Sequence, residues 1–386
     1  MLFTSAHAVE VADLKKAVAD GSVKMNFRYR YEYVDQDGID NEANASTLRG
    51  RLTFNSGSVG SWTAGLEADY VALIGDERFN STENGQTQFP VVADPEGFDL
   101  NQAFLRYKTN DLTFTGGRQR IVHADQRFLG GVAWRQNEQT FDAVRAQYSA
   151  SKTLRLDYSY VWNVNRIFGP NDGAQPSDWR SNSHFLTAHW TAADDHKFEG
   201  FIYLLDFEND NGIPNSNATY GVRYNGNLGP AKVHATYATQ SDYGDSPLDY
   251  DADFYSVGVA GKVEAVTLKA GIEVLGSDDG AVGFRTPLAT LHKFQGWADK
   301  FLGTPGTGIE DLYLGAAGSA GKLKWAATYH DFSADEGGAD YGSEINLVAN
   351  YPLTDATSLQ FKFADYSADD FATDTTKFWF TFMLKL

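Results

Sequence analysis

The feature that most constrains the fold is a two-residue alternation of apolar and polar side chains, repeated along nearly the whole chain. In residues 23–34, apolar and aromatic residues occupy the odd positions, and the even positions carry Lys24, Asn26, Arg28, Arg30 and Glu32. Successive side chains of a β-strand point to opposite faces, so this pattern predicts a strand with one apolar and one polar face. About eighteen such segments can be counted.

The segments share a length of about ten to thirteen residues and are separated by polar or glycine-containing stretches. We expect strands over residues 23–34, 46–56, 60–73, 98–109, 111–122, 139–150, 152–164, 181–193, 196–208, 217–228, 230–241, 251–264, 266–276, 308–320, 321–333, 341–352, 356–367 and 375–386.

Short and long connections alternate between these strands, which indicates how the sheet is closed. A strand of about twelve residues, tilted by about 40°, rises roughly 30 Å, enough to cross a bilayer's hydrocarbon core. Closure into a ring satisfies every backbone hydrogen bond, which lipid cannot do. The pattern predicts an all-β fold, a transmembrane antiparallel β-barrel of about eighteen strands with short periplasmic turns and long extracellular loops. The alternative is a soluble β-rich binding protein.

The start of the chain has its own organisation. Residues 1–8 end in Ala-His-Ala, the small-residue pattern of a signal-peptide cleavage site, although a basic region and a full apolar region are missing. We interpret residues 1–8 as a signal-peptide remnant and residues 9–386 as a single barrel domain. A short helix is expected over residues 11–21.

Charge is distributed unevenly between the expected loops and strands. The formal net charge is −19, which argues against nucleic-acid binding. Acidic residues gather in the long loops, which makes these loops candidates to hold divalent cations beside lipopolysaccharide. Many polar strand positions are basic instead, and these are Lys24, Arg28, Arg30, Arg49, Arg51, Arg106, Lys108, Arg145, Arg155, Arg223, Lys262, Lys269 and Lys324.

If the apolar face of each strand meets lipid, the basic positions face the lumen. A water-filled lumen lined by positive charge favours anions. The alternative is that these cations only balance inward carboxylates, for which Glu32, Glu67, Asp69, Asp157 and Glu273 are available.

Catalytic motifs give little support for an enzyme. The chain has no cysteine, and its eight histidines form no His-Glu-x-x-His motif. Residues 315–322 depart from a phosphate-binding loop in the spacing of glycine and lysine. His123, Asp125 and His292 fall in long loops, so an outer-membrane barrel hydrolase remains as an alternative. We predict no catalytic site, no metal site and no cofactor.

One long loop carries a more specific pattern. It contains Gly117-Arg118-Gln119, Asp125-Gln126-Arg127, Trp134 and Thr140-Phe141-Asp142. In these residues the chain resembles the alginate-export family of bacterial outer-membrane proteins. The resemblance implies a monomeric barrel of eighteen strands, although the sequence leaves an oligomer open. It also implies that Arg118, Arg127 and Arg145 line or brace a constriction, and that Asp125 and Asp142 hold them by bidentate pairing.

Together these observations lead to one expected function. We expect an outer-membrane channel, in contact with lipid and lipopolysaccharide, for passive diffusion of small anionic solutes such as carboxylates, uronates or related oligosaccharides. The alternative within the same family is export of an alginate-type polysaccharide.

Overall fold

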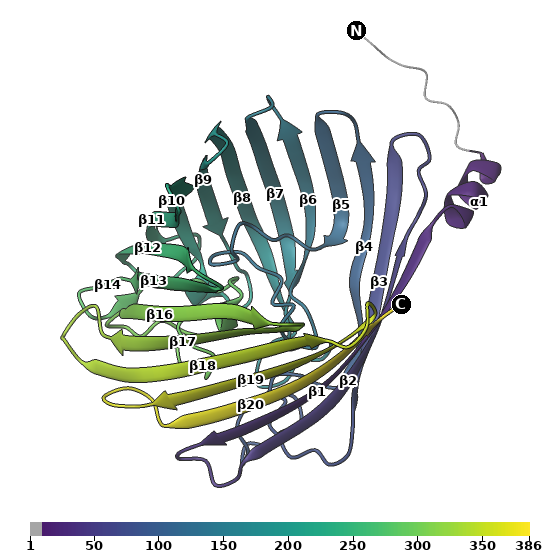
Figure 1. Cartoon of the computed structure of the whole chain (residues 1–386). Helices are drawn as coiled ribbons and strands as arrows, with labels where there is room; N and C mark the ends of the chain where they lie inside the picture. The colour runs from purple at the N-terminus through teal and green to yellow at the C-terminus, as the bar shows by residue number, and fades with distance from the viewer. Residues whose placement is uncertain (1–9) are drawn as a thin grey trace.

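The computed structural model describes residues 10–386, and within them eighteen strands close into one antiparallel β-barrel (Figure 1). Each barrel strand pairs with the next along the chain, and β1 pairs with β20 to complete the ring. The predicted fold and strand count are therefore confirmed. The barrel strands are β1 (Ser22–Gln36), β2 (Ala43–Asn55), β3 (Trp62–Leu73), β4 (Gly97–Lys108), β5 (Leu112–Gln119), β6 (Thr140–Ser149), β7 (Leu154–Asn165), β8 (Asp178–Ala193), β9 (His196–Leu205), β10 (Asn217–Leu228), β11 (Ala231–Asp242), β12 (Asp251–Val263), β13 (Val266–Leu275), β16 (Ile309–Ala320), β17 (Leu323–Ser333), β18 (Asp340–Pro352), β19 (Thr357–Ser367) and β20 (Thr375–Lys385).

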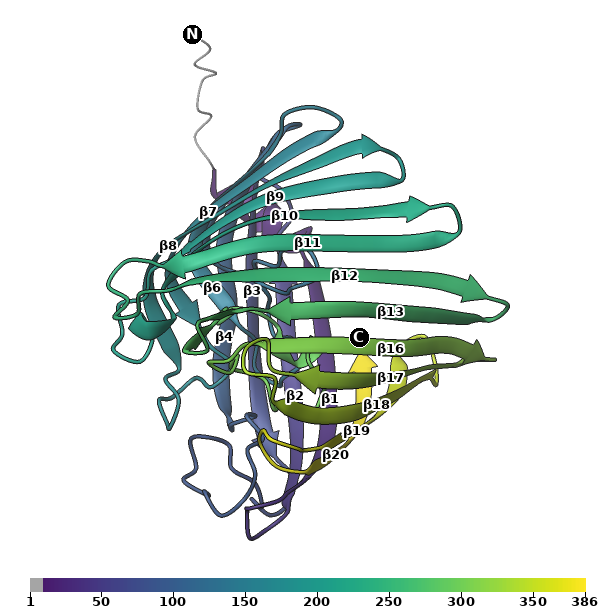
Figure 2. The same ribbon diagram turned by 90° about the vertical axis from the view of Figure 1, so that its left-hand side faces the viewer.

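The connections divide the barrel into a short-turn end and a long-loop end (Figure 2). Helix α1 (Val11–Ala19) lies at the short-turn end, where the carbonyl of Ala17 accepts a hydrogen bond from the backbone of Gly57 in the β2–β3 turn. The C-terminal Leu386 pairs with Met25 at the same end. A small hairpin, β14 (Ser277–Asp278) and β15 (Val282–Gly283), and two short 3-10 turns, η1 (Ile213–Asn215) and η2 (Leu291–Lys293), lie in the long loops. The expected signal-peptide remnant, residues 1–8, lies outside the described residues.

Helices contribute little to the described chain. No helix within residues 10–386 has the length and apolar character needed to cross a bilayer.

The register of the strands assigns each alternating set to one face of the wall. In β1, Arg28, Arg30 and Glu32 are buried, whereas the tyrosines between them are partly exposed. The same alternation continues around the ring, and outward side chains such as Leu105 and Leu314 are each 58% exposed. Because the exposed face is apolar and the covered face is polar, the barrel is inverted relative to a soluble protein, as a lipid-facing wall requires.

Two strands end earlier than expected. β5 ends at Gln119 rather than at residue 122, and β9 ends at Leu205 rather than at residue 208. Beyond Gln119 the chain leaves the wall and enters the barrel. β9 has apolar residues in both registers because its inward Phe201 and Tyr203 pack against that segment, while Ile202 faces outward.

Two loop segments fold into the lumen at the long-loop end, narrow it and build its core. They are the first inserted segment, residues 120–139, and the second inserted segment, residues 284–301 (Figure 1). Phe128 of the first contacts Phe201 and Phe254 of the wall and Phe284 of the second. We call the part of the lumen that these segments occupy the upper lumen.

Candidate pore and its charged lining

Three inward arginines hold the first inserted segment against β1 and β2. The Arg28 Nε donates to Gln136 Oε1 at 2.8 Å, and its Nη1 donates to the carbonyl of Ala133 at 2.9 Å. The Arg30 guanidinium lies 4.1 Å from the ring centre of Trp134. Arg49 donates to the carbonyl of Gln136 at 3.2 Å. All three are buried, so these contacts replace water that their charges would otherwise need.

A neighbouring ion-pair network ties the base of the same segment to β2 and β3. Arg51 Nε donates to Asp69 Oδ2 at 2.9 Å, and its Nη1 contacts Glu138. Arg120 bridges Glu67 and Glu138. Apart from the half-buried Arg120, the network is buried in the wall-to-segment contact, where a carboxylate of each pair satisfies a guanidinium.

The second inserted segment is fixed by a buried cluster around Lys362 of β19. The Lys362 ammonium lies 3.9 Å from the ring centre of Trp134 and 3.8 Å from that of Trp297. It also lies 2.6 Å from His292 Nε2. His292 Nδ1 is 2.7 Å from Asp299, and burial lowers the pKa of His292 to about 3. The neutral imidazole therefore donates from Nδ1 to Asp299 and accepts from Lys362 at Nε2.

The carboxylate of Asp299 is the centre of this cluster. It accepts a hydrogen bond from Lys377 of β20 at 3.1 Å, and Arg135 of the first inserted segment lies 3.7 Å away. The hydrogen bond from His292 and the positive charge of Lys377 hold the pKa of Asp299 well below its usual range, against the effect of burial. One carboxylate thus connects both inserted segments to the wall.

Two further expected pore arginines are also paired inside the barrel. Arg127 lies 2.8 Å from Glu273 of β13 and donates to Thr286 at 3.0 Å. Arg145 makes a bidentate pair with Asp157, at 2.8 and 2.6 Å, rather than with either aspartate that the resemblance suggested. Asp125 lies 3.2 Å from Arg223 and its side chain is 53% exposed, so it borders the open part of the lumen.

The pair of Arg118 and Asp142 lies on the opposite side of the wall. The bidentate contact itself is present, at 2.7 and 3.0 Å. However, Arg118 precedes the inward, buried Gln119, and Asp142 lies between the inward, buried Phe141 and Ala143. Since neighbouring strand residues point to opposite faces, Arg118 and Asp142 point outward. This register corrects the expectation that they belong to a constriction in the lumen.

The lumen below the inserted segments, toward the short turns, has a different lining. We call it the basic vestibule and define it by ten inward cations of the described strands. They are Lys24, Arg106, Lys108, Arg155, Lys197, Lys232, Lys262, Lys269, Lys324 and Lys385.

No member of the basic vestibule forms an ion pair with a carboxylate within residues 10–386. Nine of the ten are exposed, and the tenth, Arg106, is half-buried over the ring of Phe104. The inward carboxylates begin nearer the middle of the barrel, where Asp157 and Glu199 are buried beside Arg145 and Arg223. The vestibule cations therefore have no ion-pair partner on the strands that carry them.

The expected site residues divide between these regions. Lys24, Arg106 and Arg155 belong to the basic vestibule, whereas Arg28, Arg30, Arg49 and Arg51 face inward beneath the first inserted segment. Sequence reasoning overlooked Lys197, Lys232 and Lys385 as pore residues. Each lies within the first two residues or at the last residue of its strand, and alternation gives least information at strand ends.

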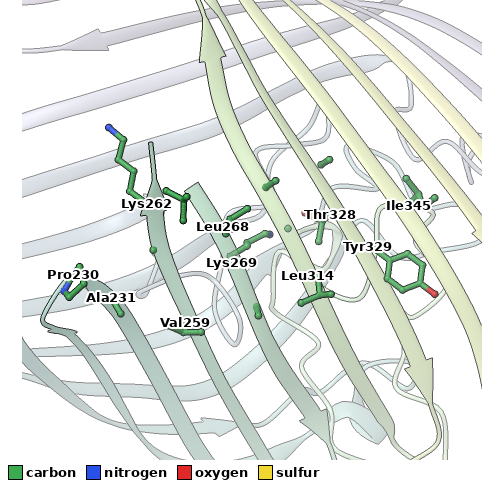
Figure 3. A pocket seen from close by; sticks show the side chains of 16 residues that line it. Pro230, Ala231, Val259, Lys262, Leu268, Lys269, Leu314, Thr328, Tyr329 and Ile345 are labelled. Carbon is green, nitrogen blue, oxygen red and sulfur yellow. The ribbon is translucent and has the colours of Figure 1, made fainter. Parts of the chain in front are cut away.

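A separate hollow of about 810 Å³ lies on the outer face of the wall (Figure 3). Five of the residues labelled in Figure 3 belong to the outward register of β12, β13 and β16 to β18. They are Val259, Leu268, Leu314, Tyr329 and Ile345. The hollow arises where the small Ala270, Ala316 and Ala327 stand between these larger side chains. We assign it to the lipid-facing surface rather than to the pore.

Comparison with known proteins decides the family. The sequence model of the family described as alginate export matches residues 20–271. The chain belongs to the alginate export family. The match covers β1 to β12 and most of β13, including the first inserted segment and six members of the basic vestibule up to Lys232, as well as Lys262 and Lys269. No curated protein matches the sequence.

Solved structures share the architecture at low sequence identity. OccAB4 of Acinetobacter baumannii has a TM-score of 0.72 at 15% identity, covering 94% of this chain and 98% of that one. The Pseudomonas aeruginosa protein OpdO has a TM-score of 0.71 at 14% identity, covering 97% and 99%. The outer membrane protein opdK of Pseudomonas aeruginosa has a TM-score of 0.73 at 12% identity, covering 95% and 98%. With the family assignment and the apolar outer wall, the protein is an outer-membrane β-barrel.

The two histidines considered for catalysis are both enclosed by protein. His123 Nδ1 lies 3.0 Å from the Tyr203 hydroxyl, and burial lowers the pKa of His123 to about 4. His292 stacks on Trp134 with ring centres 4.1 Å apart. Within residues 10–386, no group of three or more histidine or acidic side chains has an arrangement suited to a metal ion.

Proposed function

We propose that the protein is a passive outer-membrane channel that prefers small anionic solutes, carboxylates such as uronates or related oligosaccharides among them. The observation that carries this proposal is the division of charge inside the barrel. Inward carboxylates such as Asp157 and Glu199 are buried beside arginine partners, and the basic vestibule retains ten cations without an ion pair among the described residues. The family assignment and the resemblance in fold to solved outer-membrane barrels support a channel.

The channel selects solutes by the electrostatic potential and the width of its lumen, without a chemical step. Charges along a low-dielectric wall focus the potential into the water-filled space, which raises the local concentration of anions and lowers that of cations. The inserted segments narrow the lumen above the vestibule, so a solute must be small enough to pass beside them. An anion attracted by dispersed lysines is held weakly enough to leave, which conduction requires.

The test is the reversal potential of the purified protein in a planar bilayer under a KCl gradient. The proposal predicts a reversal potential with the sign of the chloride equilibrium potential, which indicates anion selectivity. A reversal potential with the sign of the potassium equilibrium potential would contradict the proposal. Membrane fractionation and heat-modifiable gel mobility test the alternative of a soluble binding protein on the same preparation.

Export of an alginate-type polymer is the second candidate, and the family description favours it. The narrowed upper lumen argues for smaller solutes, because the two inserted segments pack against each other through Phe128 and Phe284. A single-channel measurement separates the two candidates. Open KCl conductance with unrestricted passage of monomeric uronate supports the small-solute channel, and a lumen closed to both supports a polymer conduit that needs a partner.

Three properties remain part of this proposal. The channel works without a cofactor or catalytic group, it functions as a monomer in contact with lipopolysaccharide, and its acidic outer loops bind divalent cations. Turnover of lipid or peptide by the wild type that is abolished by His123→Ala or His292→Ala would favour the hydrolase alternative.

A further inference from the structure

One side of the basic vestibule contains a recess of about 530 Å³ on the wall formed by β9 to β13 and β16. Its inward lining includes Lys197, Asn225, Lys232, His234, Lys269 and Tyr313. We propose that this recess is a docking site for one small hydroxylated carboxylate, occupied in passing during permeation. The inference rests on the proposed function and adds a specific site to the diffuse charge of the vestibule.

The recess exists because small residues stand at the centre of two neighbouring inward rows of the register. In the first row, His234 is followed by Gly258, Gly271 and Tyr313. In the second row, Lys232 is followed by Ala260 and Lys269. Larger side chains therefore surround a floor of peptide backbone.

The rings of His234 and Tyr313 converge over this floor. A Cβ atom at Gly258 would lie 2.8 Å from both His234 Nε2 and the Tyr313 hydroxyl. A Cβ atom at Gly271 would lie 2.3 Å from the same hydroxyl. Two polar tips from strands on either side of β12 and β13 thus reach the same point, and only glycine beneath them leaves the space.

The ammonium groups supply the complementary charge at the rim. Lys232 and Lys269 occupy the same row, separated only by Ala260. The stem of Lys269 crosses Gly315, where a Cβ would approach its Cε within 2.3 Å, and its ammonium lies 5.4 Å from the Tyr313 ring centre. Lys197 adds a third cation beside Asn225. Asp194 and Asp195 line the turn side, where Asp195 accepts a hydrogen bond from Asn227.

The polar groups of the recess are not committed to other parts of the protein. Among the described residues, the side chains of Asn225, His234, Tyr313 and the three lysines make no hydrogen bond to protein. Ammonium groups complement a carboxylate, and the amide, imidazole and phenol complement hydroxyl groups. With two aspartates at the turn, three lysines leave one net positive charge, which matches a monocarboxylate.

The experiment measures block of single-channel KCl current by gluconate, a small hydroxylated monocarboxylate, with the full-length protein. The recess variant is Lys232→Gln with Lys269→Gln. The control is Lys24→Gln with Lys385→Gln, which removes the same charge from inward positions on β1 and β20. We expect the recess variant to weaken gluconate block by roughly tenfold and the control by less than about twofold.

A charge-neutral variant separates docking from electrostatics. Tyr313→Phe removes one hydroxyl from the recess, and we expect it to weaken gluconate block by about threefold. Heat-modifiable mobility verifies that each variant forms a barrel. Equal weakening by the recess and control variants, or no effect of Tyr313→Phe, would overturn the docking site.

The reversal potential in a KCl gradient keeps the two proposals distinguishable. A wild-type channel that selects chloride but shows no gluconate block overturns the docking site and leaves the proposed function standing. A wild-type channel that selects potassium overturns the proposed function, whatever gluconate does.

Discussion

Basic side chains line both the upper lumen and the basic vestibule, but they have opposite roles in the two regions. In the upper lumen, Arg28 and Arg30 are 5% and 2% exposed and donate to loop carbonyls, and Arg30 also lies 3.6 Å from the carboxylate of Asp94. In the vestibule, Lys24 and Arg155 are exposed and have no carboxylate partner among the described residues. A basic residue in a strand therefore acts as a structural clamp where a loop covers it and as part of the conducting surface where none does.

The comparison also explains why net charge misleads for this chain. The formal charge of −19 comes largely from residues in loops outside the lumen and from carboxylates paired inside it. Inside the lumen, a solute lies away from the first group, and the second group is paired with arginines. The field that acts on it comes from the few cations left without partners, so selectivity and net charge have opposite signs in the proposed mechanism.

The strongest way to break the upper lumen is Asp299→Asn, which keeps the shape of the side chain and removes its charge. His292, Lys377 and Arg135 then lose a shared carboxylate in a buried site. Removing one partner from a buried ionic cluster costs about 3–5 kcal/mol. We expect both inserted segments to loosen, which lowers the unfolding temperature and raises the mean and the noise of the single-channel current.

The matched control is Asp279→Asn, an exposed aspartate in the same long loop with a φ of 49° that asparagine tolerates. We expect its unfolding temperature and current to equal those of the wild type. Wild-type current and stability in Asp299→Asn would show that the cluster does not hold the segments.

Reversing the charge of the vestibule lysines should invert the ion selectivity of the channel. Replacing Lys24, Lys232, Lys262 and Lys324 together by glutamate changes the wall by eight charge units in exposed positions where burial costs little. We expect the reversal potential in a KCl gradient to move from the chloride side to the potassium side. The control is Lys15→Glu with Lys152→Glu, which reverses the charge of two exposed lysines outside the lumen. An unchanged reversal potential in the fourfold variant would place the selective region elsewhere.

The fold was predictable because it depends on local periodicity. Alternation in segments such as residues 23–34 and 375–386 indicates both strand and facing, and the even count of strands with alternating loop lengths indicates closure. The register then follows from the outward aromatic residues, for example Tyr29 against Phe382 across the β1–β20 seam.

The role of each inward cation was not predictable in the same way. Whether Arg28 is covered depends on Ala133 and Gln136, more than a hundred residues away, and no local pattern encodes that contact. Arg118 and Asp142 belong to two family motifs whose residues alternate across the wall, so treating all the motif residues as one cluster in the lumen places this pair on the wrong face. Lys197 and Lys232 were lost at strand ends, where only the neighbouring strand fixes the register.

Acidification tests the upper lumen more gently than mutation. Burial lowers the pKa of His292 to about 3 and that of His123 to about 4, below the unfolded value of about 6.5. Between those values the unfolded chain binds more protons, so stability falls as the pH falls from 6.5 toward 4. The loss approaches about 1.4 kcal/mol per pH unit for each histidine in that window.

We expect channel noise to increase from pH 7 to pH 4 as the inserted segments loosen. The His292→Asn variant keeps a donor toward Asp299 and no longer titrates, so its noise should change less over the same range. Noise that is independent of pH in the wild type would contradict this role of the buried histidines.

Ionic strength gives the smallest effect and separates the two regions directly. The Debye length is about 10 Å at 0.1 M salt and about 3 Å at 1 M, so exposed vestibule charges are screened and buried pairs are screened much less. We expect the chloride preference to decline by a few-fold between 0.1 and 1 M KCl, while the unfolding temperature, which depends on the upper lumen, stays nearly constant. Arg28→Gln with Arg30→Gln should leave the salt dependence of selectivity unchanged, because both side chains are covered by the first inserted segment. If that variant abolished the salt dependence, the clamp residues would themselves form part of the selective surface, and the division between the two regions would be wrong.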